Sequence, residues 1–277
     1  MKFATYRIGT RTAWGVVEDG GVSDLTARWA DLRSALPFDS AAIAEAGRNA
    51  PVHRLADVTL APVIPDPGKI LCVGHNYESH RVETGRDKTE HPSIFTRFAD
   101  SLIAHEAPLI RPRVSTMLDY EGELLVVIGR DCYDVGEADA LSYVAGYSCF
   151  NDASVRDWQR HTKQFTPGKN FPGTGAFGPY LVTPDEVGDP ALLSVTTRLN
   201  GEVMQSQPTA EMLFPIPTVI AYISAFTRLS PGDIIATGTP GGVGGMRTPP
   251  VWMKAGDRVE IDIPGVGLLA NTVTDQA

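Results

Sequence analysis

Acidic side chains gather where an apolar segment begins. Residues 118–129 read Leu-Asp-Tyr-Glu-Gly-Glu and continue as Leu-Leu-Val-Val-Ile-Gly. Alternate residues of a strand share one face, so Asp119, Glu121 and Glu123 are expected to lie together beside buried backbone. Like charges at that spacing oppose burial unless a cation compensates them. Mg²⁺, Mn²⁺ or Ca²⁺, each bound through oxygen ligands, would compensate these charges. The alternative interpretation is that the carboxylates lie in solvent at the end of an edge strand and bind no cation.

A second acidic position favours the metal hypothesis. The apolar stretch 143–150 leads into Asn151-Asp152, directly before a segment with a helical pattern at 154–162. Asp152 has two interpretations. It either caps that helix or supplies a further carboxylate to the same cation.

A histidine and a glutamate lie three residues apart in the polar segment that follows residues 69–74. On a helical turn such positions are neighbours, so Glu83 could hold the imidazole of His80 and raise its basicity. A His–carboxylate pair of this kind transfers protons. The same spacing is also common in surface pairs, and the other histidines show no metal-ligand spacing.

Two glycine-rich segments could approach an anion closely. Residues 167–179 contain a single lysine, Lys169, and residues 237–245 follow an apolar strand. Backbone N–H groups and threonine hydroxyls in such loops bind anions. Neither segment has the spacing of a Walker A loop or of a dinucleotide-binding fingerprint. Small carboxylates therefore remain as candidate ligands, with plain turn chemistry as the alternative.

The elements that must position these residues are mostly strands. Alternating or β-branched runs predict strands at 3–8, 14–18, 69–74, 123–129, 195–199, 232–237 and 258–263, and helical patterns cover 32–47, 154–162 and 215–228. Asn200-Gly201 predicts a tight hairpin turn, because both residues accept a positive φ. The fold class expected is mainly β with a few flanking helices, that is, α+β.

A proline-rich connector divides the chain. Pro62, Pro65 and Pro67 fall within six residues, which suits neither a helix nor a strand. We expect a small N-terminal β-containing domain over residues 1–65 and a catalytic domain over residues 66–277.

Composition argues against several classes of protein. The chain has 24 Lys+Arg against 33 Asp+Glu, a net charge of −9, and no basic footprint for nucleic acid. Its apolar runs are far shorter than the roughly 20 residues of a membrane helix. The N-terminus lacks an apolar signal-peptide core, and three cysteines cannot all pair within one chain. We therefore expect a cytoplasmic protein with reduced thiols.

Read in order, these segments resemble the fumarylacetoacetate hydrolase family, in particular its small acylpyruvase-like members. The resemblance runs from about residue 64 to the C-terminus. It rests on residues 73–77 with His80 and Glu83, on 119–124, on 146–159, on Gly168-Lys169 and on 237–244.

The resemblance implies a mixed β-sandwich roll and a homodimer. It also implies the roles of individual residues. Glu121, Glu123 and Asp152 would bind Mg²⁺ or Mn²⁺, and the catalytic residues would be His80 and Glu83, as a lid dyad that activates water, with Lys169. The expected substrate contacts are Gln159, Thr239, Arg97 and Tyr77. Two positions depart from the family pattern. Arg97 stands where many family members have Lys-Pro, and His75 stands where they often have Arg or Leu. Because these positions lie around the substrate, its identity stays open.

The function expected from these features is hydrolysis of a carbon–carbon bond in a small 2,4-dioxo acid of the acylpyruvate, fumarylpyruvate or fumarylacetoacetate kind. A divalent cation polarises such a substrate and stabilises the enolate that departs. The same site would also suit a decarboxylase, or an isomerase or hydratase, acting on a 2-oxo acid. A non-catalytic protein that binds a cation and a carboxylate is the alternative from another class.

Overall fold

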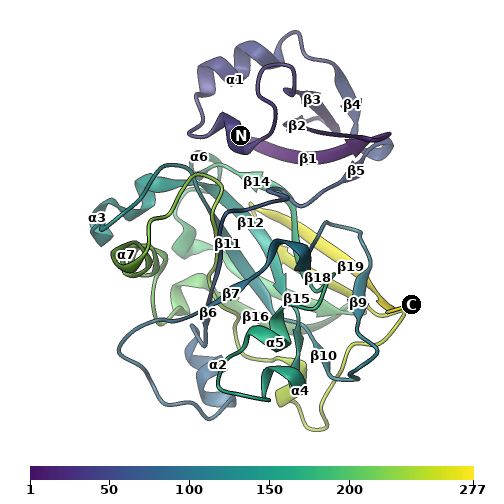
Figure 1. Cartoon of the computed structure of the whole chain (residues 1–277), viewed down its shortest axis with the longest axis vertical. Coiled ribbons are helices and arrows are strands. Elements are labelled where there is room, and N and C mark those ends of the chain that lie inside the picture. Colours follow the sequence, from purple (N-terminus) through teal and green to yellow (C-terminus); the bar gives the residue numbers. More distant parts are fainter.

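The computed structural model describes residues 1–277 and consists mainly of strands, with short helices around them (Figure 1). The large mixed sheet runs in the order β4 (Val52–Arg54), β3 (Gly21–Asp24), β2 (Arg11–Glu18), β1 (Lys2–Ile8), β14 (Gly175–Val182), β12 (Val144–Asp152), β11 (Gly122–Ile128), β17 (Ile234–Ala236), β6 (Ile70–Gly74) and β7 (Ser93–Arg97). In addition, β5 (Thr59–Leu60) pairs with β1, and β8 (Leu102–Ile103) pairs with β14.

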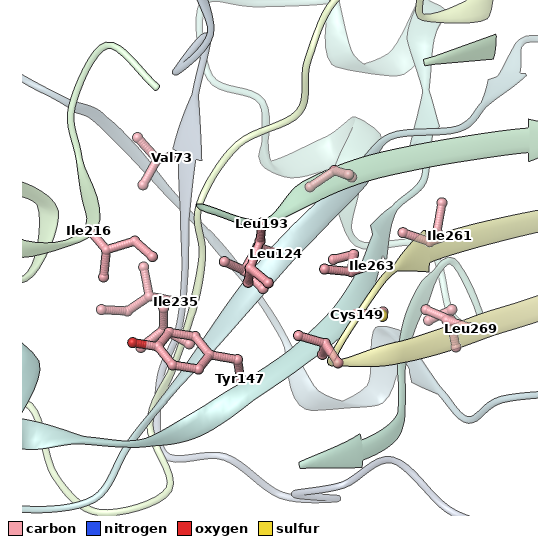
Figure 2. Packing of buried hydrophobic residues seen from close by; sticks show 14 of the residues in the cluster. Val73, Leu124, Tyr147, Cys149, Leu193, Ile216, Ile235, Ile261, Ile263 and Leu269 are labelled. Carbon is pink, nitrogen blue, oxygen red and sulfur yellow. The ribbon is translucent and has the colours of Figure 1, made fainter. Parts of the chain in front are cut away.

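A second sheet packs against the first. Its order is β16 (Glu202–Pro208), β15 (Ser194–Leu199), β18 (Arg258–Ile263), β19 (Gly267–Asp275) and β9 (Leu109–Arg111). Apolar side chains from both sheets meet between them, among them Leu124 and Tyr147 of the large sheet and Ile261 and Leu269 of the second (Figure 2). This two-layer core confirms the sheet-dominated α+β class.

The helices are few and mostly short. They are α1 (Ser40–Gly47), α2 (Glu78–Glu83), α3 (Glu137–Ala140), α4 (Arg156–Gln159), α5 (Thr166–Lys169), α6 (Pro184–Val187) and α7 (Ile216–Phe226). None of them is long and apolar enough to cross a membrane.

The predicted turn at Asn200-Gly201 is confirmed. It joins the antiparallel strands β15 and β16, and the φ angles of the two residues are 52° and 84°.

The helix expected at 32–47 covers fewer residues than its sequence pattern predicts. It begins only after Asp39, whose side chain accepts hydrogen bonds from the N–H groups of Ala41 and Ala42. Pro37 lies just before this cap and disfavours a helical residue ahead of it.

The segment 175–182, which looked like part of a glycine-rich loop, is the buried strand β14 between β1 and β12. A proline inside a central strand cannot donate to its neighbour, so Pro179 is unexpected there. The register between β12 and β14 shifts opposite it, between Tyr147 and Cys149. This irregularity accommodates the missing N–H.

Residues 1–65 form a distinct lobe at the top of Figure 1. The lobe joins the large sheet through β1, where Lys2 pairs with Val182 and Phe3 with Leu181 of β14. Its apolar residues also share a core with β6, β11 and β17. A domain boundary near residue 65 stays a prediction.

Candidate active site

Two neighbouring strands bring three carboxylates together. In the antiparallel pair β11–β12, Gly122 lies opposite Asn151 and Glu123 opposite Phe150, so Asp152 at the end of β12 falls beside Glu121. The Asp152 N–H donates to the Glu121 carbonyl at 2.9 Å. One ligand oxygen from each of Glu121, Glu123 and Asp152 lies within 4.8 Å of the others, and all three residues are buried.

Glycine at position 122 permits this arrangement. A Cβ there would lie 2.1 Å from the Thr197 hydroxyl of the second sheet, so any side chain would push the two sheets apart. The Gly122 N–H donates to the side-chain oxygen of Gln205 at 3.0 Å, which holds the start of β11 against the second sheet.

Asp119 does not join the other carboxylates, although strand periodicity placed it on their face. The chain bends at Tyr120-Glu121, between β10 (Leu118–Asp119) and β11, and β10 pairs with β13 (Ser154–Val155) instead. The Asp119 carboxylate accepts hydrogen bonds from the N–H groups of Gly244 and Gly245, both at 2.8 Å.

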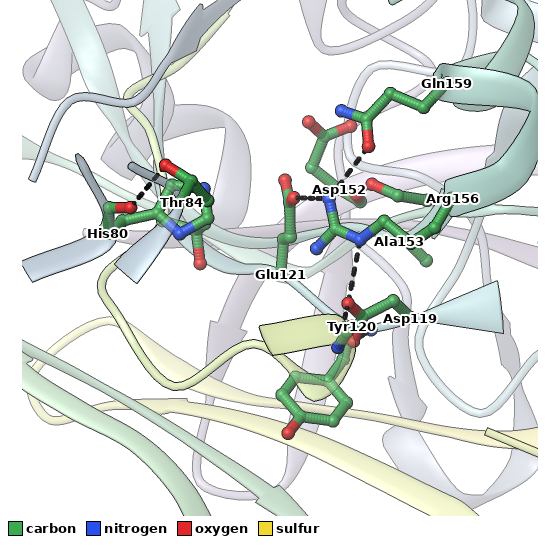
Figure 3. A network of polar contacts seen from close by, with 12 residues as sticks. His80, Thr84, Asp119, Tyr120, Glu121, Asp152, Ala153, Arg156 and Gln159 are labelled. Carbon is green, nitrogen blue, oxygen red and sulfur yellow. Dashed lines mark hydrogen bonds and ion pairs between the residues drawn. The ribbon is translucent and has the colours of Figure 1, made fainter. Parts of the chain in front are cut away.

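Three buried cations surround the carboxylates. The Lys169 ammonium donates to Glu121 Oε2 and to Asp152 Oδ2, each at 2.6 Å. Arg156 donates from Nε to Asp119 Oδ2 at 2.8 Å and from Nη1 to Glu121 Oε1 at 2.6 Å (Figure 3). Arg97 Nη1 donates to Asp152 Oδ1.

Glu123 is the one carboxylate of this group without a cationic partner. Its Oε2 accepts from the Gly238 N–H at 2.8 Å. Burial, together with the nearby charges of Asp152 and Glu121, raises the pKa of Glu123 well above its usual range. At Glu121, burial opposes the charge, but Lys169 and Arg156 outweigh it and hold the pKa low.

This donor set fits a hard divalent cation. Three convergent carboxyl groups offer the oxygen ligands that Mg²⁺ and Mn²⁺ prefer, and a bound cation would favour the ionised form of Glu123, which has no other cationic partner. Glu121, Glu123 and Asp152 would hold it.

The predicted pair of His80 and Glu83 forms on α2. His80 Nδ1 and Glu83 Oε1 are 2.7 Å apart, and Glu83 Oε2 accepts from the Gly242 N–H at 2.8 Å. The helix therefore packs against the loop that follows β17. Ser79 adds a second contact to this loop by accepting from the Gly241 N–H at 3.0 Å.

A cavity of about 630 Å³ connects His80 with Glu121 and Glu123. His80, Glu121, Glu123, Gln159 and Thr239 all line it. Lys169 and Asp152 lie just behind its wall, because both contact Glu121 or its backbone. Thus the residues expected to carry out the chemistry are gathered at one place.

Two of the expected substrate contacts lie outside the cavity lining. Tyr77 is fully buried in the larger apolar core, and its hydroxyl has no hydrogen-bond partner. Arg97 is buried behind Asp152, where it also donates to the Thr174 hydroxyl at 2.7 Å. In this structure Arg97 positions Asp152 and does not face the cavity.

Two further residues line the cavity: Arg156, to which no role was assigned from the sequence, and His75, which was noted there only as a departure from the family pattern that leaves the substrate open. The His75 ring stacks on that of His80, with centroids 5.2 Å apart and an interplanar angle of 13°. Burial, and then the neighbouring His80, lowers the pKa of His75 to about 4, so this ring stays neutral at pH 7. Both residues could have been found from the sequence, because they lie inside the segments 73–77 and 146–159 that resemble the family.

Replacing Asp119 by alanine is expected to lower the free energy of unfolding by about 3 kcal/mol, because it leaves the buried Arg156 Nε and the N–H groups of Gly244 and Gly245 without an acceptor. Denaturant unfolding of the variant measures this loss. Asp87→Ala, at an exposed site, is the control and should stay within about 0.5 kcal/mol of the parent. Equal stability of the two variants would contradict the structural role of Asp119.

The fold and this site define a class of protein: an enzyme with a buried cluster of three carboxylates that could hold a divalent cation and an adjoining His–Glu pair. The model of the fumarylacetoacetate (FAA) hydrolase C-terminal domain matches residues 69–274. The chain belongs to the fumarylacetoacetate hydrolase family.

Relatives within the family are named for reactions of small oxo acids. A mitochondrial oxaloacetate tautomerase of Rattus norvegicus is 39% identical over 267 residues, which cover 92% of this chain and 84% of the relative. An oxaloacetate tautomerase of Bacillus subtilis is 41% identical over 226 residues, covering 80% and 75%. The structure of maleylpyruvate hydrolase from Sphingobium sp. SYK-6 with manganese(II) and pyruvate is 31% identical, with a TM-score of 0.84 and 100% of both chains covered.

Proposed function

We propose that this enzyme interconverts the keto and enol forms of a small 2-oxo acid, with Mg²⁺ or Mn²⁺ as its cofactor. The observation that carries the proposal is a single cavity lined both by the carboxylates Glu121 and Glu123 and by the proton-transfer residue His80. Relatives of about 40% identity named oxaloacetate tautomerase support this reaction type over hydrolysis.

The contacts of each residue indicate its role in the proposed reaction. A cation held by Glu121, Glu123 and Asp152 would polarise the 2-oxo group and make the adjacent C–H more acidic. Lys169 would keep Glu121 and Asp152 in place, since it bridges them at 2.6 Å. Its charge also favours electron density on a nearby substrate oxygen.

His80 would carry the proton. Its Nδ1 is engaged by Glu83, which selects the tautomer with the proton on Nδ1 and leaves Nε2 as the acceptor. His80 would take a proton from the carbon next to the 2-oxo group, and the enolate oxygen would take up a proton from His80 or from water. In the reverse direction the oxygen would lose its proton and His80 would return one to the carbon. The second hydrogen bond of Glu83, to the Gly242 N–H, keeps the carboxylate from rotating away.

Hydrolysis of a carbon–carbon bond is the second candidate. The same His80 could take the proton from a water molecule instead of from carbon. Gln159 supports this reading, because its Oε1 accepts from Arg156 and its amide NH₂ is left for a substrate oxygen in the cavity. The likeness to maleylpyruvate hydrolase also favours it.

The proposal predicts that catalytic amounts of the enzyme with Mg²⁺ or Mn²⁺ speed the loss of enol-oxaloacetate absorbance and the uptake of deuterium at its C3 from D₂O. Acetylpyruvate and fumarylpyruvate are offered in parallel, and release of pyruvate reports bond cleavage. Cleavage without any effect on oxaloacetate would replace the first candidate by the second. No effect on any of the three acids would refute both.

We also propose a cellular compartment and an oligomeric state for the enzyme. The three cysteines are unpaired and buried, which supports a reducing compartment such as the cytoplasm. The homodimer implied by the family resemblance is also proposed, and sedimentation of the purified protein tests it.

A further inference from the structure

The imidazole of His75 lines the cavity, and the proposed reaction gives it no role. Its contacts within the chain are with other rings. It stacks on the His80 ring with an interplanar angle of 13°, and it meets the Phe165 ring edge to face, with centroids 5.9 Å apart. His75 therefore contacts both the proton-transfer residue and an aromatic side chain from a distant part of the sequence.

The ring contacts continue as far as the carboxylate centre. Phe165 meets Phe95 of β7 edge to face, with centroids 5.6 Å apart and an interplanar angle of 78°. The Lys169 ammonium lies 5.2 Å from the centroid of the Phe95 ring, and the same ammonium bridges two of the three carboxylates. Such edge-to-face and cation–ring pairs are favourable geometries. An unbroken series of contacts thus connects the His80 ring with Lys169.

The backbone that carries the His75 ring is held in a strained conformation. The φ of His75 is 55°, in the left-handed region that residues other than glycine seldom adopt. Strain of this kind persists where the surrounding structure holds it. The next residue, Asn76, does so: its Nδ2 donates to the carbonyls of Thr237 at 2.8 Å and Phe214 at 3.0 Å, and its Oδ1 accepts from the Phe214 N–H at 2.8 Å.

The preceding residue lets Phe165 come close. A Cβ at Gly74 would lie 3.3 Å from the Phe165 ring, so a larger residue there would press on that ring. Glycine on one side of His75 and the anchored Asn76 on the other therefore keep the His75 and Phe165 rings together.

A neutral ring suits a permanent neighbour of a proton carrier. Burial, and then the neighbouring His80, lowers the pKa of His75 to about 4. A neutral His75 can stay stacked on His80 both before and after His80 takes up a proton, whereas two charged rings would repel each other. The hydrogen bond from His80 Nδ1 to Glu83 fixes one atom of the His80 ring, and a stacked neighbour also restricts the plane of the ring.

We infer that His75 is a positioning residue, whose ring, supported by Phe165, fixes the plane of the His80 imidazole and so the direction in which Nε2 faces the substrate. The inference rests on the proposed function and adds a residue to it. Because a displacement of about 1 Å in a reacting group can cost about 100-fold in rate, the loss of this support should appear in kcat more than in KM.

Two substitutions of His75 separate its ring from its nitrogens. His75→Leu removes the stacked ring, and His75→Phe restores a flat ring without nitrogen atoms. With Mg²⁺, His75→Leu should lower kcat by about 10- to 100-fold, while KM and the affinity for Mn²⁺ stay close to wild type. His75→Phe should recover most of kcat. Steady-state turnover of the oxo acid that the enzyme converts measures these effects.

His91→Leu is the matched control. His91 is an exposed histidine that also stacks on a ring, that of Tyr222, with centroids 5.6 Å apart, and it lies outside the cavity lining. The same substitution there removes an equivalent pair of rings and should leave turnover as in wild type.

A measurement without substrate separates this inference from the proposed reaction. Nitrogen-15 NMR of histidine-labelled, Mg²⁺-loaded protein at about pH 8 reads the tautomer of His80, and the His80→Asn variant identifies its signals. Wild type and His75→Phe should show one tautomer, with the proton on Nδ1, and His75→Leu should show a mixture. This result is expected even if the enzyme converts none of the acids offered to it.

Phe165→Leu tests the support behind His75. It should lower kcat, and the double variant with His75→Leu should lose little more than His75→Leu alone, because Phe165 acts through His75. Wild-type kcat and a single His80 tautomer in His75→Leu would overturn the inference. Equal losses of kcat in His75→Phe and His75→Leu would overturn it as well, because the nitrogens of His75, and not its stacked ring, would then be required.

Discussion

A Glu123→Ala variant is expected to lose binding of Mn²⁺ and Mg²⁺, and with it all metal-dependent activity. Asp119, Glu121 and Asp152 are matched by the three cations Arg97, Arg156 and Lys169, so Glu123 is the carboxyl group whose ionised form only a metal ion would compensate. Removing it deprives the cation both of a ligand and of the local negative charge that offsets its dehydration. Titration of the metal-free protein with Mn²⁺, followed by electron paramagnetic resonance, measures the loss.

The raised pKa of Glu123 adds a pH dependence to this result. The carboxyl must release its proton before it can bind a cation, so the Mn²⁺ affinity of the wild type should rise with pH until Glu123 is ionised. His80→Asn is the control, because it changes a lining residue that is no ligand. Full Mn²⁺ occupancy of Glu123→Ala would refute the assignment of the metal centre.

A His80→Asn variant should bind Mn²⁺ about as well as wild type, while kcat falls by about 100- to 10,000-fold, the usual contribution of a general base. Asparagine keeps a polar group of similar reach but cannot accept a proton at neutral pH. The measurement is steady-state turnover of whichever oxo acid the enzyme converts, together with Mn²⁺ titration of the same preparation.

Glu83→Gln is the informative companion to this variant. It keeps an acceptor for the Nδ1 proton but removes the charge that stabilises the imidazolium, so its loss in kcat should be smaller than that of His80→Asn. Unchanged turnover in His80→Asn would exclude His80 from the mechanism, and the metal site would then need another base.

Local patterns in the sequence were sufficient for many of the elements. Apolar alternation gave β15 and β18 nearly to the residue, and Asn200-Gly201 gave the hairpin, because strand periodicity and positive φ are properties of a few adjacent residues. Patterning failed at β14, where glycines and Pro179 resemble a loop. That strand forms because neighbours on both sides supply pairing and burial, which the segment itself does not reveal.

The candidate site was likewise predicted from the sequence only in part. The sequence supplied the residue types, the spacing of Glu121 and Glu123, the His80–Glu83 turn and the order of motifs that identifies the family. It placed Asp119 with the glutamates because period-two alternation assumes an unbroken strand. The structure breaks that strand, because Tyr120 and Glu121 belong to neither β10 nor β11.

Only the tertiary structure decided which distant groups meet. The register of β11 against β12 brings Asp152 to Glu121, and Lys169 then lies between them. Arg97 turns to Asp152 and is absent from the cavity lining. Such contacts depend on strand register and on packing between segments far apart in the chain, and no local pattern of residues encodes either.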